Sequence, residues 1–167
     1  MFKVRVNGID KAIAELDTTK ARMDAKLDEF MRRLAEIGLA TASVGYSAFA
    51  WTEFKNGNPI EKKADISVTV EPIGNGYAVV AEGVEVMFVE FGAGVYYNGS
   101  ESYPGERPEG VVGIGEYGKG HGKQDAWGYK DGDGVTIARG NMPSAAMYYA
   151  KEDIRRDIER IAREVFR

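Results

Sequence analysis

The chain has 167 residues, 44% of them hydrophobic and 29% charged, a composition that suits one globular domain with one hydrophobic core. Its net charge of −4 argues against a protein that binds nucleic acid through a basic surface, but it is compatible with a wall past which DNA slides. With no cysteine and one histidine, a single chain has no disulfide, no thiolate metal site and no zinc site of the usual kind.

The first third of the sequence predicts a short strand and then a helical region, which is one long helix or two consecutive helices. Residues 2–6 alternate apolar and basic side chains, which is typical of a strand with one buried face. Over 9–50, apolar or small side chains recur at spacings of alternately three and four, with Lys20 as the one charged break. We expect this stripe to pack mostly on the chain's own sheet, and a helix of this length leaves open that part of it projects or packs on a neighbouring subunit. Gly38 and Gly45 share one face and would admit a closely packed neighbour.

The next region predicts antiparallel strands. Residues 55–59 have the composition of a loop. Residues 64–91 predict three strands, the first two forming a hairpin around the turn at 72–76. The third of these, Val84–Phe91, is apolar on both faces, which favours a central strand or one covered by a partner.

Residues 92–134 hold most of the chain's 21 glycines, interleaved with tyrosine and tryptophan. A loop of this length is uncommon inside a compact domain and is usually functional or ordered by a partner. Since disordered segments are poor in aromatic residues, we expect this stretch to be a docking arm that packs against another surface.

A strand at 135–138 and a helix at 143–166, with Pro143 in its first turn, complete the chain. The order of elements predicts a single domain over residues 1–167. Its class is α+β: a small antiparallel sheet packed by a long N-terminal helix and a C-terminal helix, with a long Gly-rich loop.

Two motifs and one histidine suggest a binding or catalytic site, but in each case the neighbouring residues argue against it. Residues 113–118 spell G-x-G-x-x-G, but residues 119–123 cannot open the helix that a dinucleotide site requires. Residues 131–134 hint at a calcium loop, yet Met142 stands where the closing glutamate belongs, so a turn between two strands is favoured. His121 lies between glycines with no orienting carboxylate, which favours a surface or interface histidine. We therefore predict a non-enzymatic protein with no catalytic, cofactor-binding or metal-binding residues.

Glu90 is the most informative carboxylate, because it lies inside the apolar run 87–91. A glutamate there points to solvent, pairs with a cation, or caps another element. We favour pairing or capping over general acid–base chemistry.

Two segments carry a resemblance to a known family. Residues 89–94, V-E-F-G-A-G, resemble the V-E-F-G-T-G signature of a family of minor capsid, virion-morphogenesis, neck or tail-completion proteins of long-tailed bacteriophages, although Ala93 replaces the usual threonine. Residues 140–147, G-N-M-P-S-A-A-M, are similar to that family's G-x-x-P-x-x-x-[FM] lead-in to its last helix, and so is the helix itself.

The resemblance implies a structural subunit of the virion neck or tail, assembled in the cytoplasm of the host bacterium. Such a subunit forms a homo-oligomeric ring, a hexamer or dodecamer, between the head connector and the tail tube, with DNA only passing through and no membrane. Alternatives within this reading are a tail terminator or a head-closure ring. A different class, a small ligand-binding or regulatory α+β module, also stays open.

Interface residues are expected mainly among the aromatic, methionine and ionisable side chains of the second half. The candidates are Glu90, Phe91, Tyr96, Tyr97, Tyr103, Tyr117, His121, Trp127, Tyr129, Met142 and Met147.

Overall fold

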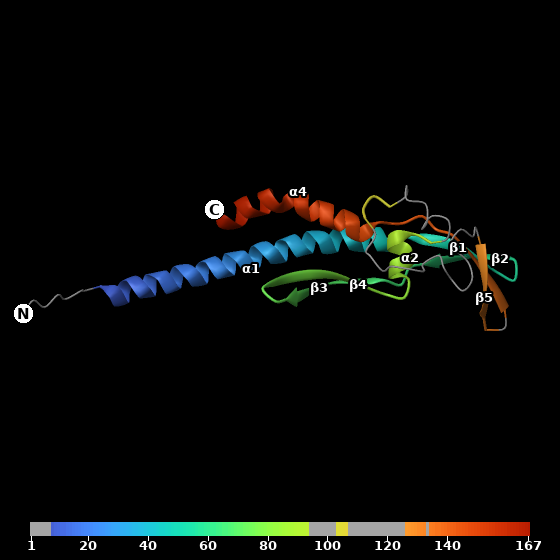
Figure 1. Ribbon diagram of the computed structural model, residues 1–167, viewed down its shortest axis with the longest axis horizontal. Helices are drawn as coiled ribbons and strands as arrows, with labels where there is room; N and C mark the ends of the chain where they lie inside the picture. Colours follow the sequence, from blue (N-terminus) through green and yellow to red (C-terminus); the bar gives the residue numbers. More distant parts are fainter. Residues whose placement is uncertain (1–7, 94–102, 107–125, 133) are drawn as a thin grey trace, which may run out of the picture.

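A computed structural model describes residues 8–93, 103–106, 126–132 and 134–167 of the chain. Its elements form an α+β fold, as predicted (Figure 1). They are α1 (Ile9–Ser47), β1 (Ala50–Lys55), β2 (Asn58–Lys63), β3 (Ser67–Ile73), β4 (Gly76–Glu82), α2 (Val86–Phe91), β5 (Ala126–Asp131), β6 (Gly134–Arg139) and α4 (Ala146–Phe166). None of the helices in these ranges combines the length and hydropathy that crossing a membrane requires.

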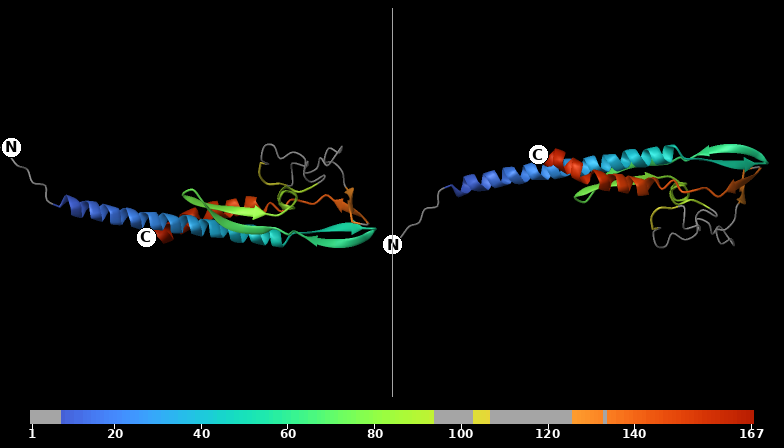
Figure 2. Two further views of the ribbon diagram at one scale, coloured as in Figure 1. Left: turned by 90° about the horizontal axis from the view of Figure 1, so that it is seen from below. Right: turned by 90° about the horizontal axis from the view of Figure 1, so that it is seen from above.

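The long helix α1 is the axis of the molecule, and α4 runs antiparallel along its second half (Figure 1). At one end of this pair, the Phe30 and Phe166 rings lie 5.7 Å apart between centroids. Towards the other end, the Thr41 hydroxyl donates to the Asp153 carboxylate at 2.7 Å. The N-terminal half of α1 extends beyond both α4 and the β3–β4 hairpin (Figure 2).

Two glycines set how closely α1 is packed. A Cβ at Gly45 would lie 2.7 Å from the Ala146 Cβ and 3.2 Å from its Cα, so the two helix backbones nearly touch there. At Gly38 an added Cβ would meet the Ile154 Cδ1 at 2.7 Å and a Val79 methyl at 3.0 Å, where α4 and β4 converge on α1. The expected close approach at both glycines is confirmed.

The described strands form two antiparallel sheets. One has the order β2-β1-β6-β5 and lies beyond the C-terminal end of α1; the other is the β3–β4 hairpin, which packs beside α1. In the larger sheet the central pair β1 and β6 brings Phe54 opposite Ile137, which joins two hairpins that are far apart in sequence.

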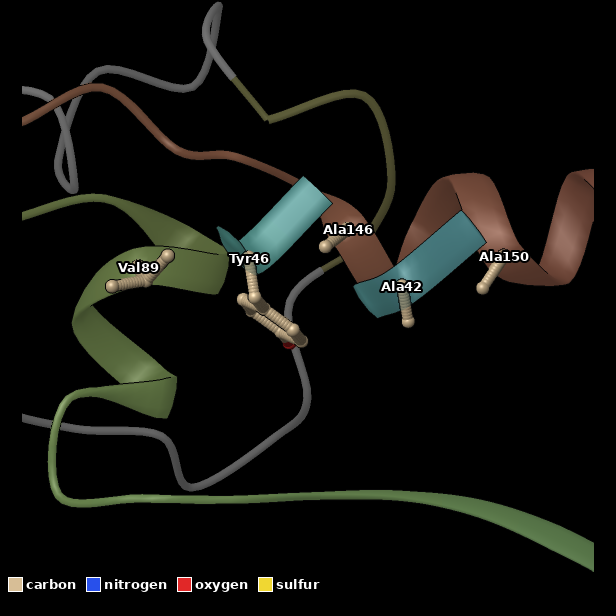
Figure 3. Close-up of a cluster of buried hydrophobic side chains, with 5 residues drawn as sticks. All are labelled: Ala42, Tyr46, Val89, Ala146 and Ala150. Carbon is tan, nitrogen blue, oxygen red and sulfur yellow. The ribbon is translucent and has the colours of Figure 1, made fainter. Parts of the chain in front are cut away.

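A small cluster of buried side chains holds the helices together where α1 ends (Figure 3). Its members are Ala42 and Tyr46 of α1, Val89 of α2, and Ala146 and Ala150 of α4. Because three of the five are alanines, close backbone approach matters here more than side-chain volume.

Some predicted elements are confirmed and others are wrong. The long helix, the β3–β4 hairpin, β6 and the last helix are present, although this helix begins at Ala146, not at 143. The predicted loop at 55–59 is wrong, because only Asn56 and Gly57 make the turn of a β1–β2 hairpin. Both residues have positive φ, as a two-residue type I′ turn requires. The expected strand at 2–6 lies outside the described residues.

The predicted third strand, Val84–Phe91, is also wrong: most of it is the short helix α2. A short run that is apolar on both faces fits a buried helix as well as a buried strand, so the spacing of its apolar residues does not distinguish the two. The predicted loop at 92–134 is wrong in its last part, because residues 126–131 form β5, which pairs with β6. The turn expected between two strands at 131–134 is confirmed.

The close contact at Gly45 leads to a stability prediction. We expect Gly45→Ala to lower the free energy of unfolding by about 1–2 kcal/mol, since overpacking against the α4 backbone outweighs the gain in helix propensity. Gly38→Ala should cost less, because the end of the Ile154 side chain can rotate away. Urea denaturation measures both.

Gly76→Ala is the matched control, since its Cβ would meet only the Met31 sulfur at 3.6 Å, and we expect a change within about 0.5 kcal/mol. A Gly45→Ala variant as stable as the control would show that the two helices can separate without cost.

Candidate functional site

Helix α2 places one carboxylate, that of Glu90, in the interior of the protein. The residues Val89, Glu90 and Phe91 are all buried, and Glu90 is only 3% exposed. The helix ends at Gly92, whose φ of 80° suits glycine. A Cβ at Gly92 would also lie 2.9 Å from the Asn141 carbonyl oxygen, so this position needs glycine for space as well.

Four donors surround the Glu90 carboxylate. Its Oε2 accepts hydrogen bonds from the Tyr46 hydroxyl at 2.9 Å and the Met147 backbone N–H at 3.0 Å. Its Oε1 accepts from the Tyr103 hydroxyl at 3.1 Å and the Tyr148 backbone N–H at 3.2 Å. We call Glu90 and these four partners the Glu90 junction.

The junction caps α4 from a distant part of the chain. The residue before α4, Ala145, makes no side-chain cap and has a left-handed conformation with φ of 52°. Two of the helix's first N–H groups are instead satisfied by Glu90, and its negative charge lies at the positive end of the helix dipole. The prediction that Glu90 pairs or caps is therefore confirmed as capping, although its element is a helix and not a strand.

The capping is reciprocal, because the segment before α4 also satisfies the carbonyl groups of α2. The Asn141 side chain donates to the Phe88 carbonyl at 2.9 Å. The backbone N–H groups of Ser144 and Ala145 donate to the Val89 and Glu90 carbonyls at 2.7 and 3.2 Å. Residues 88–93 and 140–147 thus satisfy each other's free backbone groups.

Aromatic contacts tie the segment 103–106 to the same place. The ring centroid of Tyr103 lies 4.9 Å from that of Phe91 and 6.1 Å from that of Tyr148. A Cβ at Gly105 would meet the Tyr148 ring at 2.7 Å, so this glycine allows the segment to lie flat on α4. Tyr103 therefore anchors part of the glycine-rich region to the Glu90 junction.

Tyr46 completes the junction from α1. Burial, reinforced by the neighbouring Glu90 charge, raises the pKa of the Tyr46 phenol far above its usual value. The hydroxyl therefore remains a donor to Glu90 throughout the physiological pH range.

Two hollows flank the junction. One of about 590 Å³ is lined by the junction residues together with Val86, Met87 and Lys151. The other, about 370 Å³, lies between α2 and the larger sheet and is lined by Phe49, Trp51 and Glu53, among others. Within the described ranges, no three histidine, aspartate or glutamate side chains are grouped so that they could hold a metal ion.

The chemistry that Glu90 can perform is limited by its own hydrogen bonds. Each carboxylate oxygen already accepts two hydrogen bonds from within the chain, which fills the usual lone-pair sites. Glu90 is thus placed to hold four segments together rather than to exchange a proton with a bound molecule.

The candidate interface residues are distributed unevenly in the structure. Glu90, Phe91, Tyr103 and Met147 meet at the junction, whereas Met142 stands apart with 61% of its surface exposed. Trp127 and Tyr129 lie on β5, opposite Ala138 and Thr136 of β6. The remaining four, Tyr96, Tyr97, Tyr117 and His121, lie outside the described residues.

Sequence reasoning missed Tyr46 and Tyr148, which complete the junction. Tyr46 lies midway between Val44 and Ala48, the last two positions of the helical stripe, and so falls on another face in the helical pattern. No sequence signal marks Tyr148, whose contribution to the Glu90 cap is a backbone N–H.

Replacing the carboxylate by an amide tests the cap. We expect Glu90→Gln to lower the free energy of unfolding by about 2–3 kcal/mol, since in either amide orientation the NH₂ group faces a backbone N–H. A tyrosine hydroxyl can turn to accept from the amide, but a helix N–H cannot. Thermal and urea denaturation give the value.

Glu82→Gln, at an exposed position in β4, is the control and should stay within about 0.5 kcal/mol of the parent protein. Equal stability of the two variants would mean that the cap contributes nothing that an amide cannot replace.

Comparisons of the chain with protein-family models, with curated proteins and with solved structures found no match. The basis for inferring a function is therefore the Glu90 junction and the surfaces around it.

Proposed function

We propose that this protein is a structural subunit of the head–tail joining region of a tailed bacteriophage. It would form a homo-oligomeric ring of the neck or tail-completion type, between the head connector and the tail tube. Its place is the assembled virion, and it acts through contacts with other protein subunits.

One observation carries the proposal: the mutual capping of segments 89–94 and 140–147. These are the two segments that resemble the phage family, and they lie far apart in the sequence. Their contact gives both motifs one physical purpose, since each supplies the groups that the other leaves unsatisfied. A shared structural reason of this kind makes a chance resemblance of two short motifs a weaker explanation.

The exposed apolar surface also favours a subunit of an assembly. Large apolar side chains are more than 40% exposed on α1, β6 and α4, among them Leu16, Ile137 and Ile158. Surface of this kind, repeated on several elements, is typical of proteins that bind other proteins. A closed ring needs two different patches on each subunit, and these elements supply more than one.

Electrostatics agree with a ring that DNA traverses. The chain carries a net charge of −4 and offers no excess of basic residues to neutralise phosphates. A subunit that lines a channel in this way would let DNA pass without holding it.

A replacement of residues 107–125 tests the proposed role. We expect a variant with a Gly/Ser linker of equal length in their place to keep its helices and its melting temperature. The described anchors on both sides, Tyr103 at Glu90 and β5 against β6, remain intact in it. The same variant should fail to join purified heads to tails, as counted by electron microscopy.

The unaltered protein is the positive control, and sedimentation at two concentrations reports whether it forms rings alone or with connector or tail tube. If the variant completes particles normally, residues 107–125 are not needed for joining heads to tails. A protein that stays monomeric with every virion component, and binds a small molecule instead, would favour a ligand-binding module.

A further inference from the structure

We propose that the projecting half of α1, residues 9–27, docks in a groove between α1, β4 and α4 of a second copy of this chain. This inference rests on the proposed ring and adds to it the pair of surfaces that meet between neighbouring subunits. The two surfaces lie on different parts of each subunit, as a head-to-tail ring requires.

The projecting half of α1 lacks cover of its own. Every residue from 8 to 25 is exposed, and Ile9, Ile13, Leu16 and Met23 are each at least 50% exposed. An isolated helix of this length is marginally stable in water, so we expect its row of large apolar side chains to pack against another protein surface. The same row continues towards the C-terminus, through Phe30, into the part of α1 that packs on α4.

A groove of about 430 Å³ runs along the covered half of the molecule. Leu34 of α1, Val79 of β4, and Ala150 and Ile154 of α4 contribute to its mainly apolar lining. The groove can therefore receive apolar side chains from a helix.

Charge makes the two surfaces complementary. Asp10, Asp17 and Asp24 repeat every seven residues along one flank of the apolar stripe of α1. The charged side chains in the groove lining are both basic, Lys151 and Arg155. Glu152 contacts both, at 3.3 and 3.2 Å, yet their side chains remain 50% and 66% exposed and open to a second carboxylate.

Pairing of two projecting helices with each other is less favourable. Lys20 interrupts the stripe, so a parallel pair would bring two lysines together in its seam. An antiparallel pair would instead place the row of Asp10, Asp17 and Asp24 against its own copy. Docking in the groove avoids these two pairings. Lys20, whose ammonium contacts the Asp24 carboxylate at 2.9 Å, stays neutralised within its own helix beside the basic wall of the groove.

The occupant must come from another copy. Residues 9–27 extend over about 28 Å, and α1 continues from them as one unbroken helix into its own groove wall. The projecting half extends away from α4 and the β3–β4 hairpin (Figure 2) and cannot fold back between them without breaking α1. A second copy can place its helix there without any change of conformation.

Reciprocal charge reversal tests this docking. One variant carries Asp17→Lys and Asp24→Lys; the other carries Lys151→Glu and Arg155→Glu. We expect each to weaken self-association about tenfold or more, measured by sedimentation equilibrium, and an equimolar mixture of the two to recover most of the loss. Glu61→Lys, on exposed β2, is the control for a simple change in net charge.

Cross-linking distinguishes the possible neighbours, since the chain has no cysteine of its own. Leu16→Cys and Lys151→Cys proteins of different mass are mixed and treated with a bis-maleimide, after circular dichroism has confirmed that both fold. We expect a mixed 16–151 product to dominate. A dominant 16–16 product would overturn the groove in favour of helix pairing.

The failures of the two proposals are separable. Rings that form without the 16–151 product, and that the charge reversals leave unchanged, would reject the groove while the proposed ring stands. A chain that remains monomeric at all concentrations and with every virion component would reject both.

Discussion

A buried carboxylate with no cation beside it among the described residues is the constraint on which the rest of this structure depends. Moving a charged group out of water costs several kcal/mol, and Glu90 recovers that cost only if every donor around it is in place. Two donors are backbone groups at the start of α4 and two are tyrosine hydroxyls from α1 and the segment 103–106. Loss of any one leaves charge unsatisfied, so the four segments are held in one arrangement rather than several.

The packing of α1 follows from the same constraint. The core beside Glu90 is made of small residues, and Gly45 lets the α1 and α4 backbones touch. Little apolar volume is buried at such a contact, so side-chain packing alone specifies it weakly. The cap supplies the missing specificity, because α4 must begin where Glu90 can reach its first N–H groups. Backbone proximity and polar satisfaction therefore fix the helix pair together.

The sequence was informative where a pattern has one physical meaning. The apolar stripe of α1 does not mark the buried face at the C-terminal end of the helix, since Val44 is 68% exposed and Tyr46 is buried. The helical period of α1 and the turn chemistry at 72–76 each admit one local structure, and both elements were predicted correctly. Val84–Phe91 was not, because a short run apolar on both faces fits a strand or a helix equally well. Asn56–Gly57 is a hairpin signal that the loop-like composition of 55–59 conceals. Glu90 was singled out as a cap or ion-pair partner, but Tyr46 and the N–H groups it binds become neighbours only through the tertiary fold.

The first two turns of α4 connect the Glu90 junction with the groove proposed for a neighbour's helix. Met147 and Lys151 line both the hollow at the Glu90 junction and the groove proposed for a neighbour's helix. The cap on the Met147 N–H thus positions one wall of that groove, and Tyr103 fixes the described part of the glycine-rich region to the same turns. If the surfaces that contact two neighbours belong to one rigid part of a subunit, the angle between those neighbours is fixed. A closed ring needs this property, because small angular errors at each joint would otherwise accumulate and prevent closure.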